Sequence, residues 1–103
     1  MEDMQTNTIL LEAIALQKCV AARYNRMAVR LAPHILYTRH DELYVDAVTV
    51  ERDGLPPKEI KLGAFKVAGL TELALAGQTF KPNPIFDPAA ARYDGTAVFV
   101  VEV

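Results

Sequence analysis

The chain has 103 residues, a formal charge of −2, 51% hydrophobic residues and 23% charged residues. This length predicts a single domain over residues 1–103, and the apolar content excludes an intrinsically disordered chain. No apolar run reaches the ~20 residues of a membrane-spanning helix, and the acidic start is unlike a signal peptide. We therefore expect a cytoplasmic protein with no membrane contact.

The first element along the chain is a helix, predicted over residues 9–18 (ILLEAIALQK). Its stripe of core-facing side chains consists of Ile9, Leu10, Ala13, Ile14 and Gln17. The eight residues before it are polar, and we expect them to be irregular. A helix of this length is not stable alone in water, so it must pack on another element.

After the helix the hydrophobic period changes from 3.6 to 2 residues, which predicts β-strands. The predicted strands are CVAARY (19–24), MAVRL (27–31), HILYT (34–38), ELYVDAVTVE (42–51) and KEIKL (58–62). Asn25-Arg26 and residues 39–41 supply turns between them. Pro33 cannot donate to a strand ladder, so it marks a strand end or a bend.

The second half of the chain is less regular. Residues 52–57 (RDGLPP) form a loop. Gly63 ends the predicted strand 58–62 that follows this loop. Residues 66–76 fit a strand or a helical turn equally well. The proline-rich stretch 81–88 is an extended connection. Residues 96–103 (TAVFVVEV) form a last strand that is apolar on both faces.

One helix followed by five or six short antiparallel strands predicts a mainly β fold. The economical way to bury these faces is a small, partly open barrel of the SH3-like or Sm-like kind, with the helix covering one end.

The residues that could support catalysis are few. Serine is absent from the chain, and the only thiol is Cys19, set among apolar residues as a small buried hydrophobe usually is. His34 and His40 have no second ligand at metal-site spacing, and no glycine pattern matches a phosphate-binding loop. We expect no enzyme, no metal and no cofactor. Asp46, inside an apolar strand, is either a ligand contact or a solvent-facing residue.

Basic residues and tyrosines are interleaved on the early and middle strands. The basic set is Arg23, Arg26, Arg30, Arg39, Lys58, Lys61 and Lys66. Tyr37 and Tyr44 lie on neighbouring strands. Such a face suits a nucleotide or single-stranded nucleic acid, through phosphate pairing and base stacking. The alternative is ordinary surface charge with tyrosines lining the core.

In order along the chain, these motifs resemble a WYL domain, a small Sm-like or SH3-like barrel, over roughly residues 9–80. The matching features are a helix with an Ala-Ile pair (Ala13-Ile14), a strand ending in Tyr24, an R-x-x-P run (Arg30–Pro33), Leu36-Tyr37, Leu43-Tyr44-Val45, a basic strand (58–62) and a later phenylalanine, Phe80.

The chain departs from the family pattern at three places. Leu43 replaces the tryptophan, Val45 replaces the leucine, and residues 63–65 (GAF) replace Asp-Arg-Ile. Family members often follow a helix-turn-helix in bacterial transcription regulators and are proposed to sense nucleotides or single-stranded nucleic acid. Only eight residues precede the predicted helix, so we expect a stand-alone relative.

The resemblance implies a non-catalytic ligand-sensing domain. The expected ligand-binding face consists of Arg30, Tyr37, Tyr44 and Lys61, with His34 nearby. The alternative is a protein-interaction module in which the strand 96–103 pairs with a partner or a second copy.

Overall fold

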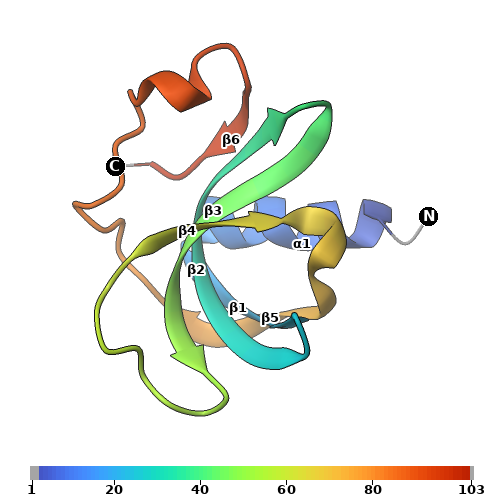
Figure 1. The fold of residues 1–103 in the computed structure, drawn as a ribbon, viewed down its shortest axis with the longest axis vertical. Helices are drawn as coiled ribbons and strands as arrows, with labels where there is room; N and C mark the ends of the chain where they lie inside the picture. The colour runs from blue at the N-terminus through green and yellow to red at the C-terminus, as the bar shows by residue number, and fades with distance from the viewer. Residues whose placement is uncertain (1–2, 103) are drawn as a thin grey trace.

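The computed structural model describes residues 3–102 as one helix and six strands, in a mainly antiparallel arrangement (Figure 1). In chain order the elements are α1 (Asp3–Leu16), β1 (Lys18–Tyr24), β2 (Met27–Arg39), β3 (Glu42–Arg52), β4 (Leu62–Lys66), the 3₁₀ turn η1 (Val67–Gly69), β5 (Thr71–Thr79), the 3₁₀ turn η2 (Ala91–Tyr93) and β6 (Ala97–Val100). The sheet order is β4-β3-β2-β1-β5, and β6 pairs with β2. The predicted fold class, mainly β with an N-terminal helix, is confirmed.

The helix α1 packs its Leu10, Ala13 and Ile14 side chains into the core, where all three are fully buried. The expectation that the residues before Ile9 are irregular is wrong for residues 3–8, which continue the helix. Asn7 is partly buried and lines a cavity at the start of β3 and η1. Contact with the barrel therefore outweighs the weak helix propensity of this polar turn. Residues 1 and 2 lie outside the described residues.

Two tight turns join β1, β2 and β3. Asn25 and Arg26 have φ angles of 52° and 66°, and His40 and Asp41 have φ angles of 52° and 63°. Left-handed φ at both central residues is typical of the type I′ turn, whose twist matches that of the flanking strands. Both turns were expected from the sequence, and the register of the three strands follows from them.

The two strands predicted on either side of Pro33 are one continuous strand, β2. β1 pairs with β2 as far as Leu31, and β6 pairs with the same edge of β2 from Ile35 onward. Between these positions the pairing with β3 shifts register. Pro33 lies at this irregularity, where its missing N–H costs no regular ladder bond. Of the two alternatives predicted for Pro33, the structure has the bend and not the strand end.

The strand predicted at residues 58–62 is displaced: β4 is Leu62–Lys66. Gly63, expected to end a strand, lies within β4 and pairs with Ala47. A Cβ atom at position 63 would lie 3.3 Å from the ring of Phe65, so glycine suits this packing. Phe65 is buried and anchors β4, whereas Ile60 is 58% exposed in the preceding loop. Burial of Phe65 thus selects the later register.

Residues 66–76, left open by the sequence, contain the turn η1 and the first part of β5. β5 pairs with β1 and forms one edge of the sheet, and β4 forms the other. The two edge strands are not hydrogen-bonded to each other in the described chain, so the curled sheet is a partly open barrel (Figure 1).

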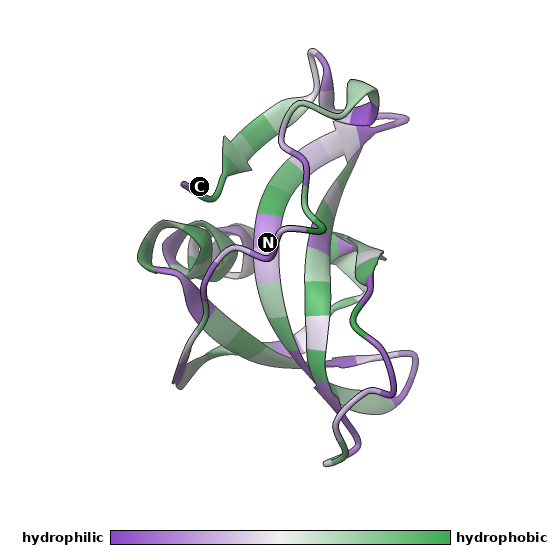
Figure 2. Cartoon of the chain, turned by 90° about the vertical axis from the view of Figure 1, so that its left-hand side faces the viewer, coloured by the Kyte–Doolittle hydropathy of each residue, from purple (hydrophilic) through white to green (hydrophobic). Residues whose placement is uncertain are grey.

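The C-terminal segment crosses the barrel and ends in a short strand. Residues 81–90 contain no helix or strand, as the three prolines predict. β6 covers only Ala97–Val100 of the predicted 96–103, and Val101, just after it, is buried in the core. Val103 lies outside the described residues. Figure 2 shows β6 as an apolar strand beside the C-terminus.

Most buried side chains form one core between α1 and the inner face of the sheet. A smaller cluster of Cys19, Ala32 and Val48 lies apart from it. Within residues 3–102 no helix combines the length and the apolar character needed to cross a membrane.

Candidate functional site

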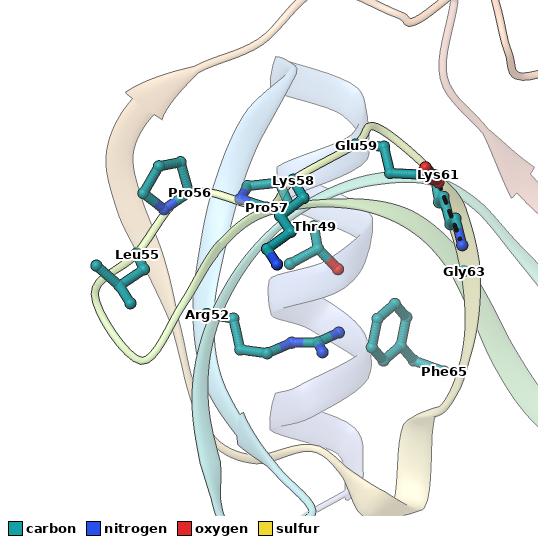
Figure 3. A pocket seen from close by; sticks show the side chains of 10 residues that line it. All are labelled: Thr49, Arg52, Leu55, Pro56, Pro57, Lys58, Glu59, Lys61, Gly63 and Phe65. Carbon is teal, nitrogen blue, oxygen red and sulfur yellow. Dashed lines mark ion pairs between the residues drawn. The ribbon is translucent and has the colours of Figure 1, made fainter.

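A cavity lies between β3, β4 and the loop that joins them. Its volume is about 560 Å³, and we call it the β3–β4 pocket. The lining side chains that matter chemically are Thr49, Arg52, Lys58, Glu59, Lys61 and Phe65 (Figure 3). The volume is within the usual range for small-molecule sites, roughly 300–1,000 Å³.

The base of this loop is held by a compact turn at the end of β3. Arg52 and Leu55 exchange both backbone hydrogen bonds, at 2.8 and 3.0 Å. Gly54, with φ of 83°, supplies the left-handed conformation that the turn requires. Asp53 donates its backbone N–H to Ala28 O (2.7 Å) and accepts the Ala28 N–H on Oδ1 (3.1 Å). The start of the loop is therefore held in place, and the two prolines that follow restrict the backbone further.

The electrostatics of the pocket are positive. Its three cations, Arg52, Lys58 and Lys61, face one carboxylate, Glu59, which pairs with Lys61 at 3.3 Å. Within the described residues, no carboxylate forms an ion pair with Arg52 or Lys58. Figure 3 shows the Arg52 guanidinium directed toward the ring of Phe65. The pocket therefore has a net positive charge and one aromatic wall.

Of the five residues predicted from the sequence, Lys61 lies in this pocket. Its side chain is 77% exposed at the rim. Lys58 belonged to the wider basic set, whereas Arg52 and Phe65 were not anticipated. Phe65 could have been found only from the register of β4, which the sequence pattern misplaces.

Arg30 lies on β2 and is engaged by a neighbouring strand. Its Nη1 atom lies 3.0 Å from Glu51 Oε1 on β3, and both side chains are more than a third exposed. Arg30 lines a separate small hollow of about 150 Å³, which also contains Glu51 and Gly54. The structure thus places Arg30 and Lys61 at different hollows.

His34 is buried, at 1% exposure, between the barrel and the proline-rich segment. Its Nδ1 lies 2.8 Å from Ala32 O, and its Nε2 accepts the backbone N–H of Asn83 at 3.0 Å. This assigns the proton to Nδ1. Burial lowers the pKa of His34, against the opposing effect of the Ala32 hydrogen bond. His34 is a neutral contact that holds residue 83 against β2.

Tyr37 and Tyr44 stack at the end of the β2–β3 hairpin. Their ring centroids are 6.0 Å apart, at an interplanar angle of 29°. The Arg39 guanidinium lies 5.7 Å from the centre of the Tyr44 ring. Tyr37 is only 2% exposed, and its hydroxyl points inward to Asp46. The structure therefore brings the two tyrosines together, but apart from Arg30 and Lys61.

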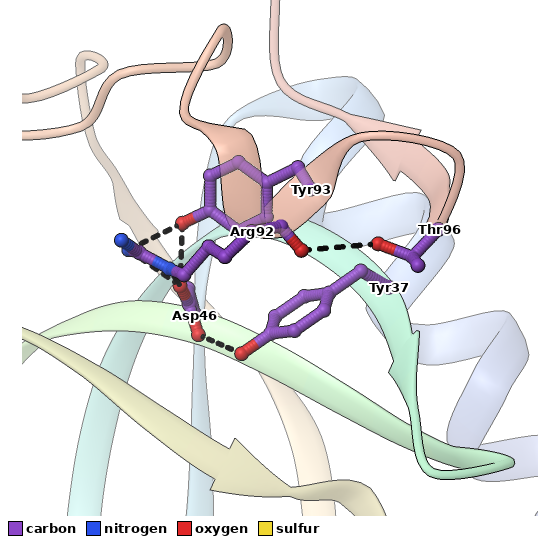
Figure 4. A network of polar contacts seen from close by, with 5 residues as sticks. All are labelled: Tyr37, Asp46, Arg92, Tyr93 and Thr96. Carbon is purple, nitrogen blue, oxygen red and sulfur yellow. Dashed lines mark hydrogen bonds and ion pairs between the residues drawn. The ribbon is translucent and has the colours of Figure 1, made fainter.

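Asp46 is the buried centre of a polar network (Figure 4). Its Oδ1 accepts the Tyr37 hydroxyl at 2.7 Å. Its Oδ2 accepts the Tyr93 hydroxyl at 2.5 Å and the Arg92 Nη2 and Nε at 3.0 and 3.3 Å. The solvent-facing alternative for Asp46 is wrong, because the side chain is 2% exposed.

The Asp46 network changes the acidity of its members. Burial, then the hydrogen bond to Asp46, raises the pKa of Tyr37 to about 12, and the same causes raise the pKa of Tyr93. The hydrogen bond to Asp46 is the main cause that raises the pKa of Arg92. Arg92 and Tyr93 carry no sequence signal that joins them to Asp46, 46 and 47 residues earlier. The network attaches η2 to the barrel.

In the part of the chain that the structure describes, the remaining reactive groups form no further cluster. Cys19 is a free, fully buried thiol whose pKa is raised by burial, as expected for a small core residue. Among residues 3–102, no three His, Cys, Asp or Glu side chains gather in a way that could hold a metal ion.

Neither a family model, nor a curated protein, nor a solved structure matches this chain.

Proposed function

We propose that this protein is a non-catalytic ligand-binding module, with a regulatory role of the kind that the WYL resemblance implies. Its ligand is a nucleotide, held in the β3–β4 pocket. The observation that carries this proposal is the presence of two cations without ion pairs, Arg52 and Lys58, beside an aromatic ring in a cavity of about 560 Å³.

The charges of the pocket favour a phosphate group. Arg52 offers a planar set of donors suited to bidentate phosphate contacts, and Lys58 offers a mobile point charge. Three other cations are already engaged: Arg30 with Glu51, Lys66 with Glu42, and Arg92 of η2 with Asp46. An incoming phosphate at Arg52 therefore displaces no existing ion pair.

The apolar part of the pocket favours the base of a nucleotide. Phe65 forms the inner wall, and Pro56, Pro57 and Leu55 lie along the loop at the outer side. Leu55 is 69% exposed. A planar ring that enters between loop and strand removes apolar surface from water, at about 25 cal/mol per Å². One mononucleotide matches the size of the cavity better than a strand of nucleic acid, which needs a longer groove.

Isothermal titration calorimetry with AMP, ATP, adenosine and inorganic phosphate tests this proposal. We expect saturable binding of AMP and ATP that weakens with salt, and weaker binding of adenosine, which lacks the phosphate. A titration to about 10 mM nucleotide at low salt without binding would overturn the proposal.

A double variant locates the site. Arg52→Ala with Lys58→Ala is expected to weaken nucleotide binding by about a hundredfold, since each hydrogen bond to a charged phosphate contributes about 1.5 kcal/mol. The matched control is Arg26→Ala with Lys81→Ala, which removes the same charge outside the pocket. If the two double variants lose affinity equally, binding follows net charge and not the β3–β4 pocket.

A further inference from the structure

The strand β6 presents an apolar surface that the β3–β4 pocket does not use. All four of its residues are exposed, and three of them are large: Val98 at 53%, Phe99 at 37% and Val100 at 40%. Adjacent side chains of a strand point to opposite faces, so β6 is apolar on both faces. The end of α1 adds Leu16, 52% exposed, beside the C-terminal end of β6, where Gln17 Nε2 donates to Glu102 O.

One edge of β6 is occupied and the other is open. Thr96 O accepts the Thr38 N–H at 3.0 Å, and Val101 donates its N–H to His34 O at 2.8 Å. Backbone polar groups alternate in direction along an antiparallel strand, so those of Phe99 face β2 and those of Val100 face away. No strand among residues 3–102 pairs with this outer edge. It carries none of the charges or prolines that usually block an exposed edge.

We propose that the outer edge of β6 pairs antiparallel with β6 of a second copy of this chain, about a two-fold axis at Phe99. Such an axis stands perpendicular to the shared sheet, so it keeps equivalent side chains on the same face. Phe99 then lies opposite Phe99 of the other protomer, and Val98 lies opposite Val100. Aromatic pairs and pairs of β-branched residues across strands are favourable combinations.

Charge also favours a second copy as the occupant. Residues 95–101 contain no charged side chain. In this register Glu102 lies opposite Thr96, so its carboxylate faces no like charge. A strand whose sequence complements itself in this way needs no partner of different composition. The shared edge is short compared with the ~800 Å² per partner of a stable interface, so we expect a weak dimer.

Sedimentation velocity across a concentration series tests the proposal. The wild-type chain should shift from monomer toward dimer between about 10 μM and 1 mM, the range expected for a short interface. Phe99→Lys, at an exposed position, should remain monomeric over that range. Leu75→Lys, on the exposed strand β5, is the matched control and should dimerise like the wild type. A wild-type monomer at every concentration, or a dimer unaffected by Phe99→Lys, overturns the proposal.

Disulfide trapping tests the register. Because the backbone groups of Phe99 face β2, the two copies of residue 99 form a non-hydrogen-bonded pair with a Cα separation of about 4.5 Å, within disulfide range. Phe99→Cys should therefore give a covalent dimer under mild oxidation, while the buried Cys19 stays reduced. Leu55→Cys, more exposed but distant in the fold, should not. Equal yields of covalent dimer from the two variants overturn the two-fold pairing.

Discussion

The Asp46 network and the β3–β4 pocket contain similar side chains but differ in whether the charged groups have partners. Both combine arginine, carboxylate and an aromatic ring. In the network Asp46 is 2% exposed, and both of its carboxylate oxygens accept hydrogen bonds. In the pocket Arg52 and Lys58 have no carboxylate partner in the described chain. A buried carboxylate that has lost its partners destabilises a fold, whereas unpaired charges at a cavity are available to a ligand. The distinction supports a stabilising role for the network and is consistent with the proposed binding role of the pocket.

The largest effect that this comparison predicts is on stability, at Asp46. Asp46→Ala leaves two tyrosine hydroxyls and a guanidinium without their shared acceptor, so the free energy of unfolding should fall by about 3 kcal/mol. Urea denaturation measures this loss. Asp94→Ala, at an exposed position near η2, is the control and should change stability by less than about 0.5 kcal/mol. Equal losses in both variants would remove the structural role of the network.

An effect of intermediate size is expected in binding. Arg52→Ala should weaken nucleotide affinity by about tenfold, or ~1.4 kcal/mol, without changing stability by more than about 0.5 kcal/mol. Arg30→Ala should leave affinity within about twofold, because Arg30 pairs with Glu51 outside the pocket. Calorimetric titration of the two variants compares them directly. The reverse ranking would return the binding face to the residues predicted from the sequence.

The smallest effect is the pH dependence of stability that His34 produces. Its pKa is lowered in the folded chain, so the unfolded chain binds the proton more readily. This contribution is complete above the unfolded pKa of about 6.5 and is lost as pH falls below it, by at most about 1.4 kcal/mol per pH unit. Urea titrations at pH 7.5, 6.5 and 5.5 should show a smaller fall for His34→Gln than for the wild type. His40→Gln, in an exposed turn, should behave like the wild type.

The elements with strong local signals were predictable from the sequence. The Asn25-Arg26 turn, the strand β3 and the proline-rich connection depend on nearby residues, and the structure contains them. The predicted alternation within β3 is wrong, because residues 45–48 are all buried. The failures are non-local. Residues 3–8 are helical because the barrel supports them, and β4 begins at Leu62 because Phe65 fills the core. Neither contact can be read from a window of ten residues.

The candidate site divides in the same way. Interleaved basic and aromatic residues indicated an anion-binding surface, but strand alternation could not show which cations already have partners. Glu51 neutralises Arg30 across two strands, and residue 83 covers His34 from a distant segment. Arg52 became a candidate only when the β3–β4 loop was placed beside Phe65. Arg30 and Arg52 are the same residue type and differ in whether a carboxylate pairs with them.

The change of partner along β2 has a consequence for backbone hydrogen exchange. β3 covers one edge of β2, while β1 and then β6 share the other, on either side of Pro33. The first half of β2 is enclosed by two long strands, so its amides open only when the sheet itself unfolds. The second half depends on four residues of β6 and on the attachment of η2. Local detachment of the C-terminal segment would uncover that half while the rest of the barrel stays folded. The amides of β2 should therefore show two levels of protection from hydrogen exchange, with the boundary at Pro33.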